Sequence, residues 1–171
     1  MEMSRQRAAL VVTGMPPGGK ERVVTHLAVD LRALGFEPMI VCLMDVGEFG
    51  QACRQRGLRV EALESHGRRD WQAVLRLRKL LKAFGPDVVN VHDRASLPYA
   101  FLAGGFGRRR PLVLTCHGLL LNDGGQAPWP QRWAMRGIRV VTAVSDQAAR
   151  EYASGLGWAG DVVAHSLGLL G

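Results

Sequence analysis

The sequence reads LVVTGMPPGGKERVVTHLAVDLRALGFEPMIVCL over residues 10–43, which is a complete strand–helix–strand pattern. Short apolar runs at residues 10–12 and 39–43 flank a segment in which apolar residues recur at helical spacing. The residues of that stripe are Val23, Val24, Leu27, Ala28, Leu31 and Leu34. Gly35 is expected to end the helix. Because the flanking runs are continuously apolar, we predict strands buried on both faces, as in a parallel sheet.

The same rhythm continues along the chain. Apolar runs at residues 88–89, 112–114 and 140–141, and a short one near 161–164, predict further strands. Residues 59–63 alternate instead, which favours a strand nearer an edge. Helices are expected from Val74 to the Gly85-Pro86 stop, after Ser96, and from Ser145 onward. We therefore predict one α/β domain over residues 1–171, a doubly wound, mostly parallel, Rossmann-like sheet with helices on both faces.

The amino-acid composition excludes several classes of protein and favours others. The chain has 171 residues, 47% of them hydrophobic and 22% charged, which suffices for a buried core and argues against disorder. No apolar run approaches the roughly 18 residues of a membrane-spanning helix. The polar start and the odd number of cysteines, three, predict a cytoplasmic protein with reduced thiols. A net charge of +7 favours an anionic partner, but no nucleic-acid-binding motif accompanies it.

Polar residues follow several predicted strands directly. They are the loop at residues 14–20, His92-Asp93, His117-Gly118 and Ser145. Ligands of doubly wound sheets bind beyond the carboxyl ends of the strands. We therefore expect these residues to form a site at one edge of the sheet.

The first of these loops, GMPPGGKE over residues 14–21, nearly matches a Walker A phosphate loop. Glu21 stands where that motif needs a hydroxyl for Mg²⁺, and Pro16 and Pro17 each remove a backbone N–H donor. The loop therefore argues against a nucleoside triphosphatase. Two interpretations of its glycine pair, Gly18-Gly19, stay open: a turn that lets a phosphate or sugar approach the start of a helix, or only a tight strand–helix turn.

His117 follows a buried strand and precedes a glycine, so its imidazole can donate to a hydroxyl or accept a proton near neutral pH. A purely structural histidine is the alternative. His92 and Asp93 can form a polar pair at the neighbouring strand end. No third ligand lies at a suitable spacing, so we expect no metal.

Residues 118–133 show little periodicity, and a long loop inside a compact domain is usually functional or mobile. Trp129 and Trp133 in this stretch can stack on a sugar ring or rest in a lipid interface, or they can simply pack the loop.

The order and spacing of these motifs resemble the N-terminal domain of family 4 glycosyltransferases, which are retaining enzymes of the GT-B architecture. The residues that carry the resemblance span nearly the whole chain: Gly18-Gly19-Lys20-Glu21-Arg22-Val23-Val24, Leu27-Ala28, Leu31, Gly35, Val41-Cys42-Leu43, Pro86-Asp87-Val88-Val89, His92, Thr115-Cys116-His117-Gly118 and Ala143-Val144-Ser145. The family also often has His-x-His at the fourth strand end, whereas this chain reads Asn90-Val91-His92.

The resemblance implies a specific function. In this family two Rossmann-like domains face each other, the N-terminal one binding the acceptor and the C-terminal one the nucleotide-diphosphate sugar. Carried over by position, His117 would be the catalytic residue that contacts the transferred sugar. The substrate-binding residues would be Gly18, Gly19, Glu21, His92, Asp93, Gly118 and Ser145. The nucleotide sugar would serve as co-substrate, with no metal and no other cofactor.

The sequence ends at Gly171 without a donor-binding half. We therefore expect a piece of a longer transferase, a truncated reading frame or one subunit of a split enzyme, with the C-terminal lobe supplied in cis or in trans. On its own the chain is expected to bind nucleotide sugar poorly and to catalyse nothing. A non-catalytic binding lobe and a P-loop-like nucleotide-binding protein remain alternatives.

The basic charge suggests where such a lobe would work. The expected acceptor is a saccharide or a lipid-linked sugar. Arg76, Lys79, Lys82 and the run Arg108-Arg109-Arg110 could hold the domain against an anionic membrane at its cytoplasmic face, at about 1 kcal/mol per charge. The alternative is that these runs are ordinary solvated faces.

Overall fold

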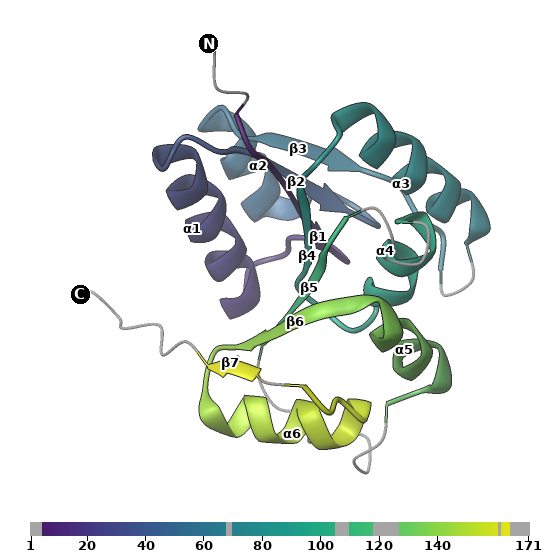
Figure 1. The fold of residues 1–171 in the computed structure, drawn as a ribbon. Coiled ribbons are helices and arrows are strands. Elements are labelled where there is room, and N and C mark those ends of the chain that lie inside the picture. Colours follow the sequence, from purple (N-terminus) through teal and green to yellow (C-terminus); the bar gives the residue numbers. More distant parts are fainter. Residues whose placement is uncertain (1–4, 68–69, 105–109, 118–126, 161, 165–171) are drawn as a thin grey trace.

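The computed structural model describes residues 5–67, 70–104, 110–117, 127–160 and 162–164. Strands and helices alternate along these residues (Figure 1). The strands are β1 (Arg7–Val12), β2 (Glu37–Cys42), β3 (Arg59–Ala62), β4 (Val88–Val91), β5 (Leu112–Cys116), β6 (Ile138–Ala143) and β7 (Val162–Ala164). The helices are α1 (Gly19–Ala33), α2 (Gly47–Gln55), α3 (Trp71–Phe84), α4 (Leu97–Ala103), α5 (Trp129–Ala134), the 3₁₀ turn η1 (Met135–Gly137) and α6 (Asp146–Leu156).

The seven strands form one sheet in the order β3-β2-β1-β4-β5-β6-β7, and each neighbouring pair is parallel. This confirms the predicted doubly wound α/β fold and the edge position of β3. The strand order reverses between β1 and β4, which are paired from Ala8 with Val88 to Val11 with Val91. A doubly wound sheet offers its ligand crevice beyond the carboxyl ends of the strands at that reversal.

Helices cover both faces of the sheet, but unevenly (Figure 1). On one face Leu10, Val12 and Ile40 pack with Val24 and Ala28 of α1. The opposite face packs against a larger helical layer that contributes Leu77, Leu97, Ala134 and Ala148, among others. The strands β1 and β2 are therefore buried on both sides, as their continuous apolar runs predicted.

Two details differ from the sequence-based prediction. Val140 is 36% exposed and Val163 45% exposed, because α1 and α2 cover the side of the sheet formed by β1 to β3 and do not reach β6 and β7. Residues 129–134, expected within an irregular stretch, form the short helix α5, which begins with Trp129-Pro130, where a proline costs no hydrogen bond.

Candidate functional site

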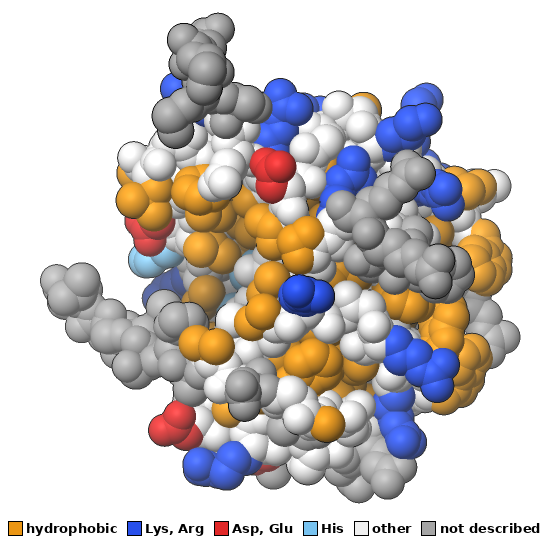
Figure 2. All heavy atoms as spheres, viewed as in Figure 1, with side chains coloured by type: hydrophobic (Ala, Val, Ile, Leu, Met, Phe, Trp, Pro, Cys, Tyr) orange, Lys and Arg blue, Asp and Glu red, His pale blue; other side chains and the backbone are white. Residues whose placement is uncertain are grey.

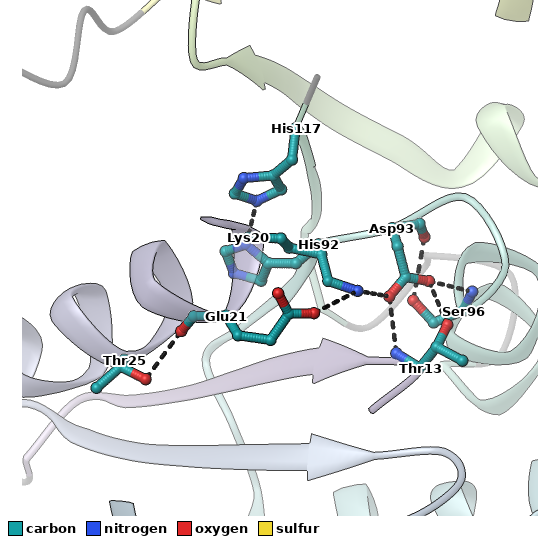
Figure 3. A network of polar contacts seen from close by, with 8 residues as sticks. All are labelled: Thr13, Lys20, Glu21, Thr25, His92, Asp93, Ser96 and His117. Carbon is teal, nitrogen blue, oxygen red and sulfur yellow. Dashed lines mark hydrogen bonds and ion pairs between the residues drawn. The ribbon is translucent and has the colours of Figure 1, made fainter. Parts of the chain in front are cut away.

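The carboxyl ends of β1, β4 and β5 bring most of the predicted site residues together (Figure 3). The start of α1 supplies Lys20 and Glu21, the residues after β4 supply His92 and Asp93, and His117 follows β5. Hydrogen bonds and ion pairs join them in two groups, one centred on Asp93 and one formed by the histidines. The site therefore lies at the strand-order reversal, as the sequence predicted.

Asp93 holds the loops after β1 and β4 together. Its carboxylate accepts hydrogen bonds from the Thr13 amide at 2.7 Å, the Thr13 hydroxyl at 2.7 Å and the Ser96 amide at 2.8 Å. Burial alone would raise the pKa of Asp93, but the Lys20 ammonium and these donors hold it below its usual value. Asp93 is thus ionised and holds these two loops in position, while its predicted contact with a substrate stays a prediction.

The helix predicted after Ser96 is α4, and a serine at its start can cap it with its side chain. Ser96 does occupy the N-cap position, but its hydroxyl donates to the Asp93 carbonyl at 3.1 Å instead of accepting from the helix. The Ser96 amide is satisfied by Asp93, so the capping contact comes from the preceding aspartate.

Lys20 lies between two carboxylates. Its Nζ is 3.2 Å from Asp93 Oδ2 and 3.3 Å from Glu21 Oε1, and the Glu21 side chain is buried. A P-loop lysine must reach toward phosphates, whereas this ammonium is already neutralised by two internal partners. The arrangement therefore argues further against the P-loop alternative.

Gly18 and Gly19 have different surroundings. A Cβ built on Gly18 would clash with Glu21 Oε2, so a side chain there would require the buried carboxylate to move. A Cβ on Gly19 would meet no atom within 4 Å. The first turn of α1 is thus open in front of Gly19, and the unpaired N–H groups of a helix start favour an anionic or hydroxyl-bearing ligand there.

His92 and His117 form a hydrogen-bonded pair, with 3.0 Å between His92 Nδ1 and His117 Nε2. His92 is 1% exposed and His117 half-buried. Burial lowers the pKa of His92 to about 3, and the nearby His117 ring adds to the shift. Burial and the Lys20 charge lower the pKa of His117 to about 4. Both rings are therefore neutral near pH 7, so His117 is suited to donating or accepting one hydrogen bond and not to carrying a charge.

The surroundings of His92 select the tautomer of this pair. His92 Nε2 is buried and has no partner among the described residues. A buried N–H without an acceptor costs more than a buried lone pair without a donor. The proton of His92 therefore belongs on Nδ1, which donates to His117 Nε2. His117 then carries its own proton on Nδ1 and can offer it as a donor.

One predicted site residue, Ser145, has no hydrogen bond to this cluster among the described residues. Ser145 is exposed, and its hydroxyl accepts from the Ala148 amide at 3.2 Å, so it caps α6. Its neighbour Val144 donates through its backbone to the Cys116 carbonyl, which places Ser145 at the same sheet edge as His117. Gly118 lies outside the described residues. Thr13, which the sequence analysis did not single out, follows β1 directly, as His92 follows β4.

Cysteine chemistry is not part of the site. Cys42, Cys53 and Cys116 are free and buried. Burial raises the pKa of Cys42 and of Cys116 to about 12, so these thiols stay protonated and unreactive.

Within the described ranges, no three His, Cys, Asp or Glu side chains gather as metal ligands, and no helix there is long and apolar enough to span a membrane.

The fold and this edge cluster define a class: one Rossmann-like lobe with a polar rim of neutral histidines and an open glycine turn. Residues 17–164 match the family model described as Glycosyltransferase Family 4. The chain belongs to that family, and the resemblance to the N-terminal lobe of a GT-B enzyme is confirmed. Among curated protein sequences, none matches the chain.

Solved structures share the fold at low identity. A glycosyltransferase from Rickettsia africae is 19% identical with a TM-score of 0.73, over 94% of this chain and 42% of that one. Anabaena HepE, in complex with UDP, is 18% identical with a TM-score of 0.71, over 93% and 43%. Sucrose-phosphate synthase from Thermosynechococcus elongatus is 14% identical with a TM-score of 0.67, over 94% and 47%. The chain therefore spans less than half the length of these three proteins.

Proposed function

We propose that this chain is the acceptor-binding N-terminal lobe of a retaining glycosyltransferase that uses a nucleotide-diphosphate sugar. The observation that carries the proposal is the neutral His92–His117 pair at the same sheet edge as the open Gly19 turn. This edge lies where the strand order reverses between β1 and β4. Membership of glycosyltransferase family 4 supports glycosyl transfer in general. Retention, a hexosyl donor and independence of metal ions are parts of the proposal.

The rim residues suit sugar hydroxyls. With its proton on Nδ1, His117 would donate to a hydroxyl of the transferred sugar near the reacting carbon. The amide groups at the start of α1 would face the donor phosphates or the acceptor, where the helix dipole adds a favourable field. Asp93 and Lys20 would hold the β1 and β4 loops in place beside the substrate. Ser145 and Gly118 would border the acceptor from the β6 and β5 sides.

The rest of the enzyme would come from a second lobe. Departure of a nucleoside diphosphate needs cationic groups that face the leaving phosphates, usually a large catalytic contribution. The Lys20 ammonium is occupied by Asp93 and Glu21 and is a poor candidate for that task. We therefore propose a donor-binding C-terminal lobe, in cis or in trans. The UDP-bound neighbour HepE makes a uridine nucleotide the first donor moiety to test.

A titration of the isotope-labelled 171-residue chain tests the proposal. Glucose and N-acetylglucosamine, used at millimolar concentration as probes for the transferred sugar and the acceptor, should move the amide signals of Gly19, His117 and Ser145. UDP-glucose should bind more weakly than micromolar, and no sugar transfer should be detected. Sugar transfer by the chain alone, micromolar UDP-glucose binding, or sugar probes that leave all three signals unmoved would overturn it.

Gly19→Val provides the matched variant. Its side chain enters open space, so the fold should be retained, whereas the approach of a sugar to the α1 start should be blocked. Loss of the probe-induced shifts with unchanged circular dichroism is the expected result. Shifts that persist at full size would place the ligand elsewhere.

The cellular setting follows from the same residues. Three buried, unpaired thiols suit a reducing compartment. We therefore propose a cytoplasmic lobe that acts on a saccharide or lipid-linked acceptor.

A further inference from the structure

All four tryptophans of the chain lie on one side of the molecule. A hollow of about 420 Å³ is lined by Trp71 of α3, Tyr99 of α4, and Trp129 and Trp133 of α5, with further apolar residues between them. Trp129 and Trp133 also border a second hollow, of about 600 Å³, together with Trp158, which follows α6. The two hollows therefore lie on either side of Trp129 and Trp133. We name the tryptophan strip after its members Trp71, Leu75, Trp129, Trp133 and Trp158.

The strip exposes unusually large apolar groups. Trp71 is 67% exposed, Leu75 65% and Trp129 75%. Single exposed apolar residues need no explanation, but a contiguous apolar surface marks an interaction site. Figure 2 shows hydrophobic side chains gathered along the side formed by α3 and α5, with Lys and Arg side chains among them. Trp71 and Leu75 are one helical turn apart, so they present one continuous face of α3.

Basic groups border this apolar surface. Arg132 and Arg136 line the second hollow. On α3 the exposed Arg78, Lys79 and Lys82 follow Leu75 toward the C-terminal end of the helix. Of the cations expected from the sequence at a membrane, Arg76 is instead paired with Asp70 at 3.1 Å, and Arg108 and Arg109 lie outside the described residues. Asp70 is the one acidic residue that lines either hollow within the described part of the chain.

We propose that the tryptophan strip is a docking surface for an anionic lipid bilayer. Tryptophan has an apolar body and a polar N–H, which suits it to the boundary between acyl chains and headgroups. The arginines and lysines beside it would face anionic headgroups. A second copy of the chain is disfavoured as the occupant, because two surfaces carrying these five cations would repel each other. This inference goes beyond the transferase proposal and does not depend on it.

The fold gives this surface a defined relation to the candidate site. The first turns of α3 and α4, which supply Trp71 and Tyr99, follow β3 and β4 and so lie at the carboxyl edge of the sheet. His92, Asp93 and His117 lie at that same edge. Trp133 and Trp158, by contrast, come just before β6 and β7, so the strip runs along the larger helical layer from the carboxyl edge of β3 and β4 toward the amino ends of β6 and β7.

Intrinsic fluorescence tests the proposal directly, because all four tryptophans belong to the strip. The 171-residue chain is mixed with vesicles of phosphatidylcholine alone or with a third of the lipid replaced by phosphatidylglycerol. With the anionic vesicles, the emission maximum should move to shorter wavelength and the chain should co-sediment, less so as salt is raised. Neutral vesicles should bind much more weakly.

Matched variants separate the strip from the rest of the surface. Trp71→Gln and Trp129→Gln should each lower partitioning into anionic vesicles about tenfold. Arg132→Ser and Arg136→Ser should each lower partitioning into anionic vesicles about fivefold. Leu34→Gln, at an exposed leucine on the opposite layer, and Arg56→Ser, just after α2, should leave it unchanged. Circular dichroism checks that each variant is folded.

Several outcomes would overturn the proposal. They are no partitioning into anionic vesicles, equal binding to neutral vesicles, or equal losses in the strip and control variants. A shift in emission that depends on protein concentration without lipid, with dimers in sedimentation, would assign the strip to self-association instead. Each outcome is read without a sugar-transfer assay, so it is independent of the proposed function.

Discussion

The buried histidine pair makes the stability of the chain sensitive to acid. In the folded chain the pKa is about 3 for His92 and about 4 for His117, against 6.5 for an unperturbed histidine. Between these values the unfolded chain binds more protons than the folded one. The two neutral histidines therefore contribute their full share to the free energy of unfolding above pH 6.5. This contribution falls as the pH drops toward 4, by about 1.4 kcal/mol per pH unit for each histidine.

Urea unfolding at stepped pH measures this slope. His92→Phe, which removes one titrating ring while keeping most of its volume, should reduce the slope to about half. Asp93, whose pKa is lowered, adds a further loss only below its ordinary value of 3.8. A flat profile between pH 6.5 and 4 would mean that the pair is not buried as described.

Gly18 and Glu21 should be energetically coupled. The Glu21 carboxylate lies against Gly18 and is ion-paired with Lys20. Gly18→Ala would displace this carboxylate, at a cost of about 1 kcal/mol in the free energy of unfolding. In Glu21→Ala the same Gly18→Ala change should cost almost nothing, because the obstacle is gone. A double-mutant cycle by chemical unfolding gives the coupling, and additive effects would show that the two residues do not touch.

For single residues, the sequence predicted which side chains lie close together at the sheet edge, but not which of them bind each other. Strand ends predict where polar residues meet, so His92, Asp93 and His117 could be predicted from position alone. The roles of Lys20 and Glu21 could not, since a near-match to a phosphate loop looks the same whether the lysine faces ligand or protein. Only the packing of Asp93 against Thr13 decides that the lysine turns inward.

Among the elements, α6 depends on Ser145 for its start. The hydroxyl accepts from the Ala148 amide, so Ser145→Ala should lower the free energy of unfolding by about 1 kcal/mol. Ser145→Asp keeps an acceptor and should restore stability. If Ser145 also contacts substrate as proposed, the aspartate variant would be stable yet impaired in acceptor binding. Equal stability of the alanine variant and the unchanged chain would contradict the cap.

The α2 start supports the loop that carries the glycine pair. Gly47 has φ of +63°, and a Cβ there would lie 2.3 Å from the Met15 carbonyl oxygen. Gly47→Ala should therefore cost about 3 kcal/mol, from backbone strain plus displacement of the Met15 loop. Gly57→Ala is the control, since its φ of +73° is similar and its nearest neighbour is 3.6 Å away. Thermal unfolding of both should show a clearly smaller loss at Gly57.

The elements themselves were largely predictable, because periodicity and stop signals act locally. Gly85, for instance, takes the left-handed conformation at the end of α3, as the Gly-Pro stop indicated. Whether a side chain is buried, however, also depends on elements that are distant in sequence, which a local pattern does not reveal. Leu34 is 75% exposed although it fits the α1 stripe, and Val140 is exposed although its run is apolar, because α1 ends at Ala33 and does not reach β6.

At the scale of the whole molecule, the sequence predicted the sheet but not the surface. Alternating strands and helices imply a parallel order, and right-handed crossovers leave few alternatives. The tryptophan strip could not be predicted. Its residues come from α3, α5 and the end of α6, more than 80 positions apart in sequence, and only helix packing brings them side by side.

The sheet separates two cores, and each holds its own thiols. Cys42 of β2 and Cys53 of α2 lie in the core that α1 and α2 cover, whereas Cys116 lies in the core under the opposite layer. A thiol reagent therefore reacts only after the layer above its cysteine has opened. Because both cores share β1 and β2, removing one layer uncovers strands that the other needs. We expect equal labelling rates at all three cysteines in mild urea, followed by mass spectrometry. Faster labelling of Cys116 alone would reveal two independently opening halves.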